Sequence, residues 1–276
     1  MTGYLMNDSE FKNVVRKGFD QASIGYDNSP MRFFDKSAVR LVELSALKGN
    51  EIILDVATGT GKVALAAAKH LKNGKVIGID LSEGMLDCAK VKAQKAGLTN
   101  ILFKCEDIDH ASFPNNYFDG IFCSFGVFFF SDMQNLISKL IQTMKPGSFF
   151  AITSFADGSF RPLSDLTLER FKQYGVKLPD SYTWQRLDSH QKHYELLNTI
   201  GLKNINSHTE PMGYYLKNTN EWWDIVYYTG FRSFLNQLSV EQVERYKEEH
   251  LKEISKTSDK QGILLNVDVI FTIAYR

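Results

Sequence analysis

The chain has 276 residues, and its 32 Lys and Arg balance its 32 Asp and Glu, so the formal net charge is zero. A neutral chain lacks the basic patch that binds phosphate backbones, and we expect no nucleic-acid partner. No apolar stretch reaches the roughly 18–20 residues that a membrane-spanning helix needs. The length suffices for a single domain with a large buried core.

The amino-terminal segment and the cysteines predict a protein of a reducing compartment. The segment from Met1 to Phe11 is polar and lacks the apolar core of a signal peptide. Cys88, Cys105 and Cys123 are odd in number and have neither zinc-site spacing nor a disulfide framework. We therefore expect a cytoplasmic protein without a metal site, and the sequence leaves its oligomeric state open.

The first part of the chain predicts alternating strands and helices. Two helices, over residues 9–20 and 34–47, come first. Strands are then expected at 51–55, 75–80, 101–104, 118–124 and 149–155, with helices at 61–71, 83–97 and 132–144. This order predicts an α/β fold with a doubly wound, Rossmann-like parallel sheet, whose ligands bind at the carboxyl ends of the strands.

The second part has a different character. Helices are expected at 163–175, 188–200 and 240–254, strands at 203–215 and 263–274, and an aromatic-rich segment at 220–234. Residues 221–260 form an insertion between the last two strands, and a smaller insertion follows residue 155. We expect both to cover the carboxyl ends of the strands as a helical lid.

The turn after the first strand is the most informative feature. Asp55 ends an apolar run, and Gly59 and Gly61 follow it, which lets the backbone approach a ligand closely. A phosphate-binding P-loop is excluded, because Val56 stands where its first Gly is required and Val63 where its Ser or Thr is required.

Two nucleoside cofactors remain to be compared. Residues 59–64 fit the G-x-G-x-x-A pattern of dinucleotide sites. A carboxylate at Asp55 would repel a pyrophosphate but would attract the sulfonium and ammonium of S-adenosylmethionine. Asp80 ends the next strand, where it can accept hydrogen bonds from ribose hydroxyls. The acidic turn therefore favours S-adenosylmethionine over NAD.

Five segments resemble the motifs of class I S-adenosylmethionine-dependent methyltransferases. They are Asp55–Gly61, Ile79–Leu86, Cys105–Ile108, Phe118–Ser124 and Met144–Ser148, which together lie within about residues 50–155. The first is most similar to the form in ubiquinone and menaquinone biosynthesis C-methyltransferases. The resemblance implies a seven-stranded sheet with an antiparallel last strand.

The resemblance also implies a cofactor site. By matching position, the residues that would bind S-adenosylmethionine, and its product S-adenosylhomocysteine, are Tyr26, Asp55, Ala57, Thr58, Gly59, Gly61, Asp80, Leu81, Met85, Asp107, Ile108 and Ser124. It divides the chain into amino-terminal helices over the cofactor (1–48), a cofactor-binding core (49–157) and the remaining strands with the lid (158–276), all within one domain.

The acceptor site is less well defined by the sequence. Phe125, Phe128, Trp184, Trp223 and Tyr227 could line an aromatic pocket for a methyl acceptor, or could simply pack in the core. The histidines weighed as a catalytic base are His110, His190, His193 and His208, and the sequence singles out none of them. His190 and His193 share one face of a predicted helix, and we expect both to have a surface role.

The sequence thus predicts an enzyme that transfers a methyl group from S-adenosylmethionine to an O, N or C atom of a small, apolar or aromatic molecule. Three alternatives stay open. They are a relative that binds the cofactor without catalysis, a methyltransferase acting on a macromolecule, and an NAD-dependent oxidoreductase.

Overall fold

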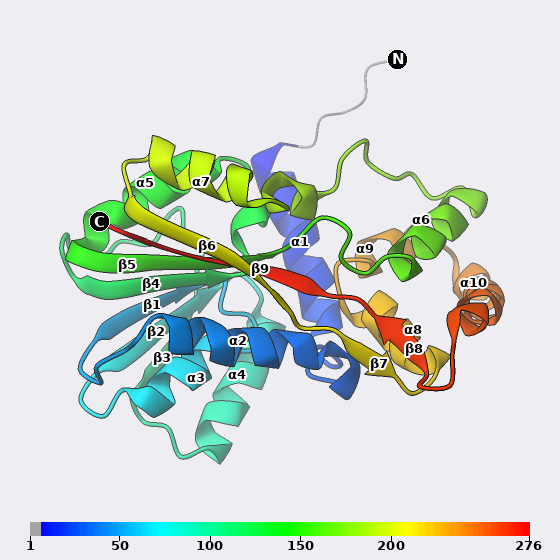
Figure 1. Ribbon diagram of the computed structural model, residues 1–276, viewed down its shortest axis with the longest axis horizontal. Helices are drawn as coiled ribbons and strands as arrows, with labels where there is room; N and C mark the ends of the chain where they lie inside the picture. Colours follow the sequence, from blue (N-terminus) through cyan, green and yellow to red (C-terminus); the bar gives the residue numbers. More distant parts are fainter. Residues whose placement is uncertain (1–6) are drawn as a thin grey trace.

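A computed structural model describes residues 7–276, so part of the expected polar amino terminus, residues 1–6, lies outside the described residues. The fold is α/β, with a seven-stranded sheet in the order β3-β2-β1-β4-β5-β9-β6 (Figure 1). Strand β9 lies between β5 and β6 and is antiparallel to both, whereas β1 to β5 are parallel. The expected doubly wound sheet with an antiparallel last strand is confirmed.

The strands of the large sheet follow the predicted order. They are β1 (Ile52–Val56), β2 (Lys75–Asp80), β3 (Ile101–Cys105), β4 (Phe118–Ser124), β5 (Met144–Phe155), β6 (Lys203–Pro211) and β9 (Asp268–Tyr275). In the central strands nearly every side chain is buried, as in Ile53, Leu54 and Val56 of β1. Continuous apolar strands of this kind arise because helices cover both faces of a parallel sheet.

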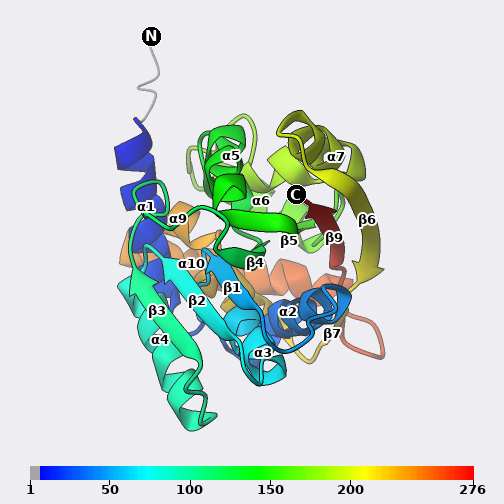
Figure 2. The ribbon, with the colours of Figure 1, turned by 90° about the vertical axis from the view of Figure 1, so that its left-hand side faces the viewer.

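The helices cover both faces and one end of the sheet. They are α1 (Asp8–Ala22), α2 (Arg32–Leu44), α3 (Lys62–His70), α4 (Glu83–Lys95), α5 (Met133–Thr143), α6 (Leu163–Gln173), α7 (His190–Thr199), α8 (Thr219–Tyr228), α9 (Arg232–Leu235) and α10 (Val240–Ile254). Helices α2, α3 and α4 lie on one face, and α5 and α7 lie on the other (Figure 2). Helices α6, α8, α9 and α10 gather beyond the carboxyl ends of the parallel strands, where a lid was expected (Figure 1). None of these helices is long and apolar enough to span a membrane.

Two of the predicted strands are each divided into two pieces. The expected strand 203–215 consists of β6 and a separate β7 (Tyr214–Leu216), and the expected strand 263–274 consists of β8 (Ile263–Leu265) and β9. Strands β7 and β8 pair with each other in a second, two-stranded sheet. The break comes at Gly213, where a Cβ atom would lie 2.3 Å from the Leu265 carbonyl oxygen. The segments around Gly213 and Leu265 approach each other too closely there for regular strand pairing between residues that carry side chains.

Candidate active site

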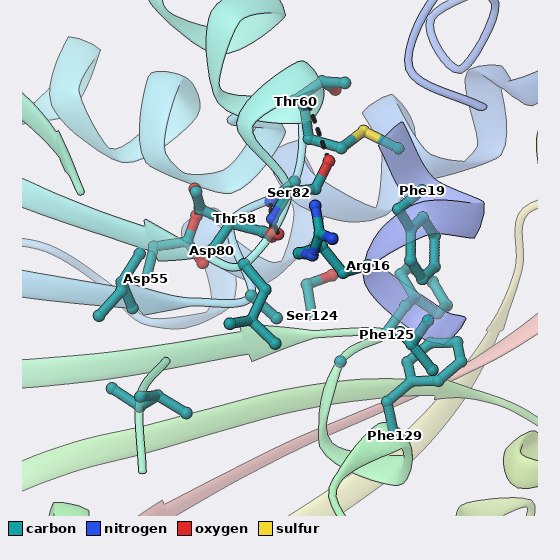
Figure 3. Close-up of a pocket in the computed structure, with 18 of the residues that line it drawn as sticks. Arg16, Phe19, Asp55, Thr58, Thr60, Asp80, Ser82, Ser124, Phe125 and Phe129 are labelled. Atoms are coloured by element: carbon teal, nitrogen blue, oxygen red, sulfur yellow. Dashed lines mark hydrogen bonds between the residues drawn. The ribbon is translucent and has the colours of Figure 1, made fainter. Parts of the chain in front are cut away.

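A cavity opens at the carboxyl ends of β1, β2, β3 and β4, where the strand order reverses around β1 (Figure 3). Eleven of the twelve predicted cofactor residues line it: Tyr26, Asp55, Ala57, Thr58, Gly59, Asp80, Leu81, Met85, Asp107, Ile108 and Ser124. These residues come from the ends of four strands, from the start of α4 and from the segment after α1. Such a crevice is where doubly wound sheets bind their ligands.

Gly61 is the predicted residue that does not line this cavity. It is the N-cap residue of α3 and lies in the left-handed region, at φ 79°, and a Cβ atom there would lie 2.9 Å from the Ala89 Cβ atom and 3.2 Å from the Phe103 ring. Gly61 therefore allows the turn to pack closely on α4 and β3. In contrast, a Cβ atom at Gly59 would meet nothing within 4 Å. The space beside Gly59 is open for a ligand to reach the backbone.

Asp80 is held in place by the backbone. One of its carboxylate oxygens accepts a hydrogen bond from the Gly59 N–H at 2.8 Å, and the other accepts one from the Ser82 N–H at 2.9 Å (Figure 3). Burial raises the pKa of Asp80, and these two hydrogen bonds oppose the rise. Each oxygen keeps a second lone pair, so the carboxylate can accept two further hydrogen bonds from vicinal hydroxyls, as a ribose requires.

Asp55 is a buried carboxylate behind the glycine turn. It accepts a hydrogen bond from the Thr58 hydroxyl at 2.5 Å and one from the Ala64 N–H at 3.0 Å. Burial nevertheless raises its pKa to about 7. A carboxylate in this position is stabilised in its charged form when a cation binds nearby. The buried Asp55 carboxylate therefore fits a ligand that carries an ammonium and a sulfonium.

The backbone is strained where β1 and β4 end. Ala57 has φ 52° and Phe125 has φ 53°, although neither is glycine, and both line the cavity. Gly126, which follows Phe125, fits against Ala57 only because it has no side chain, since a Cβ atom would lie 2.8 Å from the Ala57 Cβ atom and 2.9 Å from the Cys123 Sγ atom. Strain of this kind gathers at functional sites, because the surrounding structure holds it there.

Helix α1 closes the cavity with residues that the sequence did not assign to the site. Phe11, Val15 and Phe19 line it at intervals of four residues, one face of a helix. Arg16 also lines it and pairs with Asp20 at 3.0 Å (Figure 3). The four-residue apolar spacing is a signal in the sequence that could have revealed this face.

Lys12 of α1 reaches Asp107, one of the predicted cofactor residues. Its ammonium lies 2.9 Å from Asp107 and 2.6 Å from Asp109, and it also pairs with Asp8. Burial would lower the pKa of Lys12, but the hydrogen bonds to Asp109 and Asp107 outweigh burial and raise it. Lys12 therefore stays charged and fastens α1 to the end of β3.

A second ion cluster holds the segment after α1. Asp27 accepts a hydrogen bond from the Thr60 hydroxyl at 2.8 Å and pairs with Lys62 at 2.6 Å and with Lys92 at 2.5 Å. These contacts join the segment to the glycine turn, to α3 and to α4. They fix its position beside the cavity, and with it the position of Tyr26.

A second cavity adjoins the first and lies under α6 and α8. Three of the predicted acceptor residues line it: Phe125, Phe128 and Trp184. Trp223 and Tyr227 line neither cavity. Trp223 packs near Tyr246 of α10, and Tyr227 lies against the Arg232 guanidinium. The residues of the aromatic segment that do line the cavity are Ile225, Thr229, Gly230 and Phe231.

None of the four histidines weighed as a base lines either cavity, as far as residues 7–276 are described. The expectation that His193 has a surface role is wrong. His193 is fully buried, and its ring nitrogens lie 2.7 Å from the Ser154 and Thr272 hydroxyls. Burial lowers its pKa to about 4. It is a structural residue between α7 and the sheet.

The comparisons with known proteins agree with this geometry. A family model described as a methyltransferase domain matches residues 53–147. The aklanonic acid methyltransferase DauC of Streptomyces sp. (strain C5) is 34% identical over 158 residues, which cover 56% of this chain and 72% of that protein. A demethylmenaquinone methyltransferase of Bacteroides fragilis is 32% identical over 165 residues, which cover 58% of this chain and 67% of that protein.

The fold is shared more widely. The YcgJ protein of Bacillus subtilis superposes with a TM-score of 0.59 at 17% identity, over 87% of this chain and 98% of that one. The identity to DauC and to the demethylmenaquinone enzyme, and the share of each that the chain covers, establish the family. The chain belongs to the class I S-adenosylmethionine-dependent methyltransferases and is similar within them to the ubiquinone and menaquinone biosynthesis group.

Proposed function

We propose that the enzyme methylates a small apolar or aromatic molecule that enters the second cavity. The observation that carries this proposal is the lining of that cavity: Phe33, Phe125, Phe128, Phe155, Phe160, Trp184 and Phe231. An aromatic wall of this extent gains most from burying an apolar ring system. The relatives whose names mention aklanonic acid and demethylmenaquinone act on small molecules, which supports the same conclusion.

In this proposal the first cavity holds S-adenosylmethionine, which supplies an electrophilic methyl group when bound. Asp80 binds the ribose hydroxyls, Asp55 faces the ammonium, and Asp107 with Ile108 borders the adenine. Leu81, Met85, Ala57, Thr58, Gly59 and Ser124 complete the walls, and Tyr26 closes the methionine end. Gly61 contributes by letting the turn pack closely on α4 and β3, and not by contacting the cofactor. The enzyme's own task is to hold the acceptor in line with the methyl group and to exclude water.

Methyl transfer into extracts tests the proposal. The protein is incubated with radiolabelled S-adenosylmethionine and with aqueous, organic and macromolecular fractions of host cells, with Asp80→Ala as the control. We expect label in the organic fraction, and only with the unmodified protein. Label confined to protein or RNA would contradict the proposal, and so would tight binding of S-adenosylhomocysteine with no label in any fraction.

A further inference from the structure

The loop between β4 and α5, residues 125–132, forms part of both cavities. The first cavity is here called the cofactor cavity and the second the acceptor cavity. Phe125 and Phe129 line both, Phe130 lines the cofactor cavity and Phe128 lines the acceptor cavity. A ligand in the cofactor cavity therefore borders a loop that also forms a wall of the acceptor cavity.

The segment 182–188 forms another wall of the acceptor cavity. It contains a short 3₁₀ helix, η3 (Thr183–Leu187). Four of its side chains line the acceptor cavity: Tyr182, Trp184, Gln185 and Asp188. The structure describes this segment in full, and none of its residues lines the cofactor cavity. Any effect of the cofactor on this wall must therefore pass through other residues.

Arg186 joins this segment to the loop. Its guanidinium donates hydrogen bonds to three backbone carbonyl oxygens of the loop, those of Phe128 at 3.1 Å, Phe130 at 2.5 Å and Ser131 at 2.9 Å. Within residues 7–276, no backbone N–H donates to these three oxygens. In the same described part of the chain, the three bonds of Arg186 are the only hydrogen bonds between the segment and the loop.

A guanidinium suits this arrangement of carbonyls. Its N–H groups are fixed in one plane, so one terminal nitrogen can donate to two acceptors while the other donates to a third. Here Nη1 donates to Phe128 and Phe130, and Nη2 donates to Ser131. Hydrogen bonds from a charged donor contribute more than those between neutral groups. One side chain thus fixes three positions of the loop at once.

The segment has separate bonds to α7 and to β5. The Leu187 carbonyl oxygen accepts a hydrogen bond from the Ser154 hydroxyl of β5 at 2.5 Å. The Lys192 ammonium of α7 donates to the Gln185 carbonyl oxygen at 2.6 Å. Neither bond involves the loop. Removing the donors of Arg186 would therefore detach the segment from the loop and leave it bonded to α7 and β5.

The loop is also joined to α1, the helix that closes the cofactor cavity. The Ser131 hydroxyl donates a hydrogen bond to the Asp8 carboxylate, and Asp8 pairs with Lys12. The Phe129 ring meets the Phe19 ring of α1 edge-on, at 5.4 Å between centroids (Figure 3). A cofactor held under α1 therefore restricts the same loop that Arg186 holds.

We infer that Arg186 is a positioning residue, which couples the loop to the segment 182–188 so that a bound cofactor orders this wall of the acceptor cavity. Arg186 itself lines neither cavity. The inference rests on the proposed function, because it requires the cofactor in the first cavity. A ligand that orders a segment lowers the entropic cost of binding a second ligand there. The two ligands then raise each other's affinity by the same factor.

Hydrogen exchange followed by mass spectrometry tests the inference with the full-length protein, and S-adenosylhomocysteine is the probe. In the unmodified protein we expect the probe to slow amide exchange in residues 182–188 about tenfold, although these residues do not line its cavity. Titration calorimetry establishes that the probe binds. Protection of residues 125–132 without protection of 182–188 would overturn the inference and leave the proposed function standing. If the probe does not bind, both fail.

Two substitutions test Arg186 itself. Arg186→Met removes the donors and keeps an unbranched side chain, so the probe should slow exchange in residues 182–188 less than about twofold while it still protects the glycine turn, residues 57–61. Arg186→Lys keeps the charge without the planar donors and should recover only part of the effect. Circular dichroism checks the fold. The full protection of 182–188 in either variant would overturn the role assigned to Arg186.

Arg170→Met is the matched control. Arg170 is also a partly buried arginine of the lid, and it pairs with Glu249 and Glu253 of α10 at 2.9 Å each. It lines neither cavity. This variant should have a lower Tm but should keep the protection of residues 182–188 by the probe. Loss of that protection here too would show that any loosening of the lid has the same effect, which would also overturn the inference.

Discussion

The Asp80 carboxylate accepts a hydrogen bond of 2.8 Å from the Gly59 N–H, and this contact joins the end of β2 to the turn after β1. The two residues are 21 positions apart in the sequence, and they become neighbours because β1 and β2 are adjacent parallel strands. The same carboxylate thus stabilises the turn and is the group proposed to bind the ribose.

Asp80→Ala tests whether this carboxylate binds the cofactor without being needed for the fold. We expect the affinity for S-adenosylhomocysteine to fall by about 3 kcal/mol or more, because hydrogen bonds to a charged group contribute about 1.5–3 kcal/mol each. Titration calorimetry measures the affinity, and circular dichroism checks that the fold is kept. Asp119→Ala is the control, since Asp119 is also a strand carboxylate but lines neither cavity. Unchanged affinity in Asp80→Ala would contradict the ribose assignment.

The raised pKa of Asp55 makes cofactor binding depend on pH. Its pKa is about 7 in the free protein, against an ordinary 3.8, so the group is largely protonated below about pH 7. A bound ammonium favours the carboxylate, and binding therefore releases a proton at low pH. We expect affinity for S-adenosylhomocysteine to be about tenfold weaker at about pH 6 than at about pH 8. In Asp55→Asn this dependence should disappear.

Asp55 also makes the free energy of unfolding depend on pH. Because its folded-state pKa lies above the unfolded value, its contribution to the free energy of unfolding is present below about pH 4 and is lost as pH rises toward about 7. Asp55→Asn should therefore gain stability relative to the unmodified protein as pH rises through this window. Chemical denaturation at several pH values measures the difference, and a constant difference would contradict the raised pKa.

His193 affects the free energy of unfolding with the opposite dependence on pH from Asp55. Its pKa is lowered by burial to about 4, against an ordinary 6.5, so the unfolded chain binds a proton that the folded protein excludes. The free energy of unfolding should fall by up to about 1.4 kcal/mol per pH unit as pH drops from about 6.5 to about 4. His193→Asn should lack this contribution. The comparison is the difference in unfolding free energy between the two proteins across that range, and no trend would contradict it.

Lys12 should control how firmly α1 covers the cofactor cavity. Lys12→Met leaves Asp107, Asp109 and Asp8 without their shared cation, and we expect faster amide hydrogen exchange in residues 8–22 with little change in the central strands. Affinity for S-adenosylhomocysteine should fall as well. Lys12→Arg keeps the charge and is the control. Equal exchange in Lys12→Met and in the unmodified protein would show that other contacts hold the helix.

The two tryptophans named from the sequence should behave differently. Trp184 lines the acceptor cavity and stacks on Tyr182 at 4.5 Å, so Trp184→Ala should lower kcat/KM for an apolar acceptor and leave cofactor affinity unchanged. Trp223 is buried beside α10, so Trp223→Phe should lower the Tm and leave KM unchanged. The reverse pattern would contradict the placement of the acceptor. Kinetics with a small aromatic acceptor and thermal denaturation distinguish the two results.

The amino-acid sequence by itself determined the cofactor side of the site. Asp55, the glycine turn and Asp80 each stand at the end of an apolar run, and the alternation of strands and helices brings the ends of such runs to one edge of a sheet. Local patterns suffice there, because turn chemistry and strand ends depend on residues that are close in sequence. The same reasoning gave most element boundaries in residues 51–155.

Only the tertiary structure decided the acceptor side. Helix α8 is apolar on more than one face, so periodicity could not tell that Ile225 faces the cavity while Trp223 faces α10. Nor could it tell that His193 is buried or that Lys12 reaches Asp107 across 95 residues of sequence. These facts depend on which surfaces meet when distant segments pack. That packing is a property of the whole chain, and no local pattern encodes it.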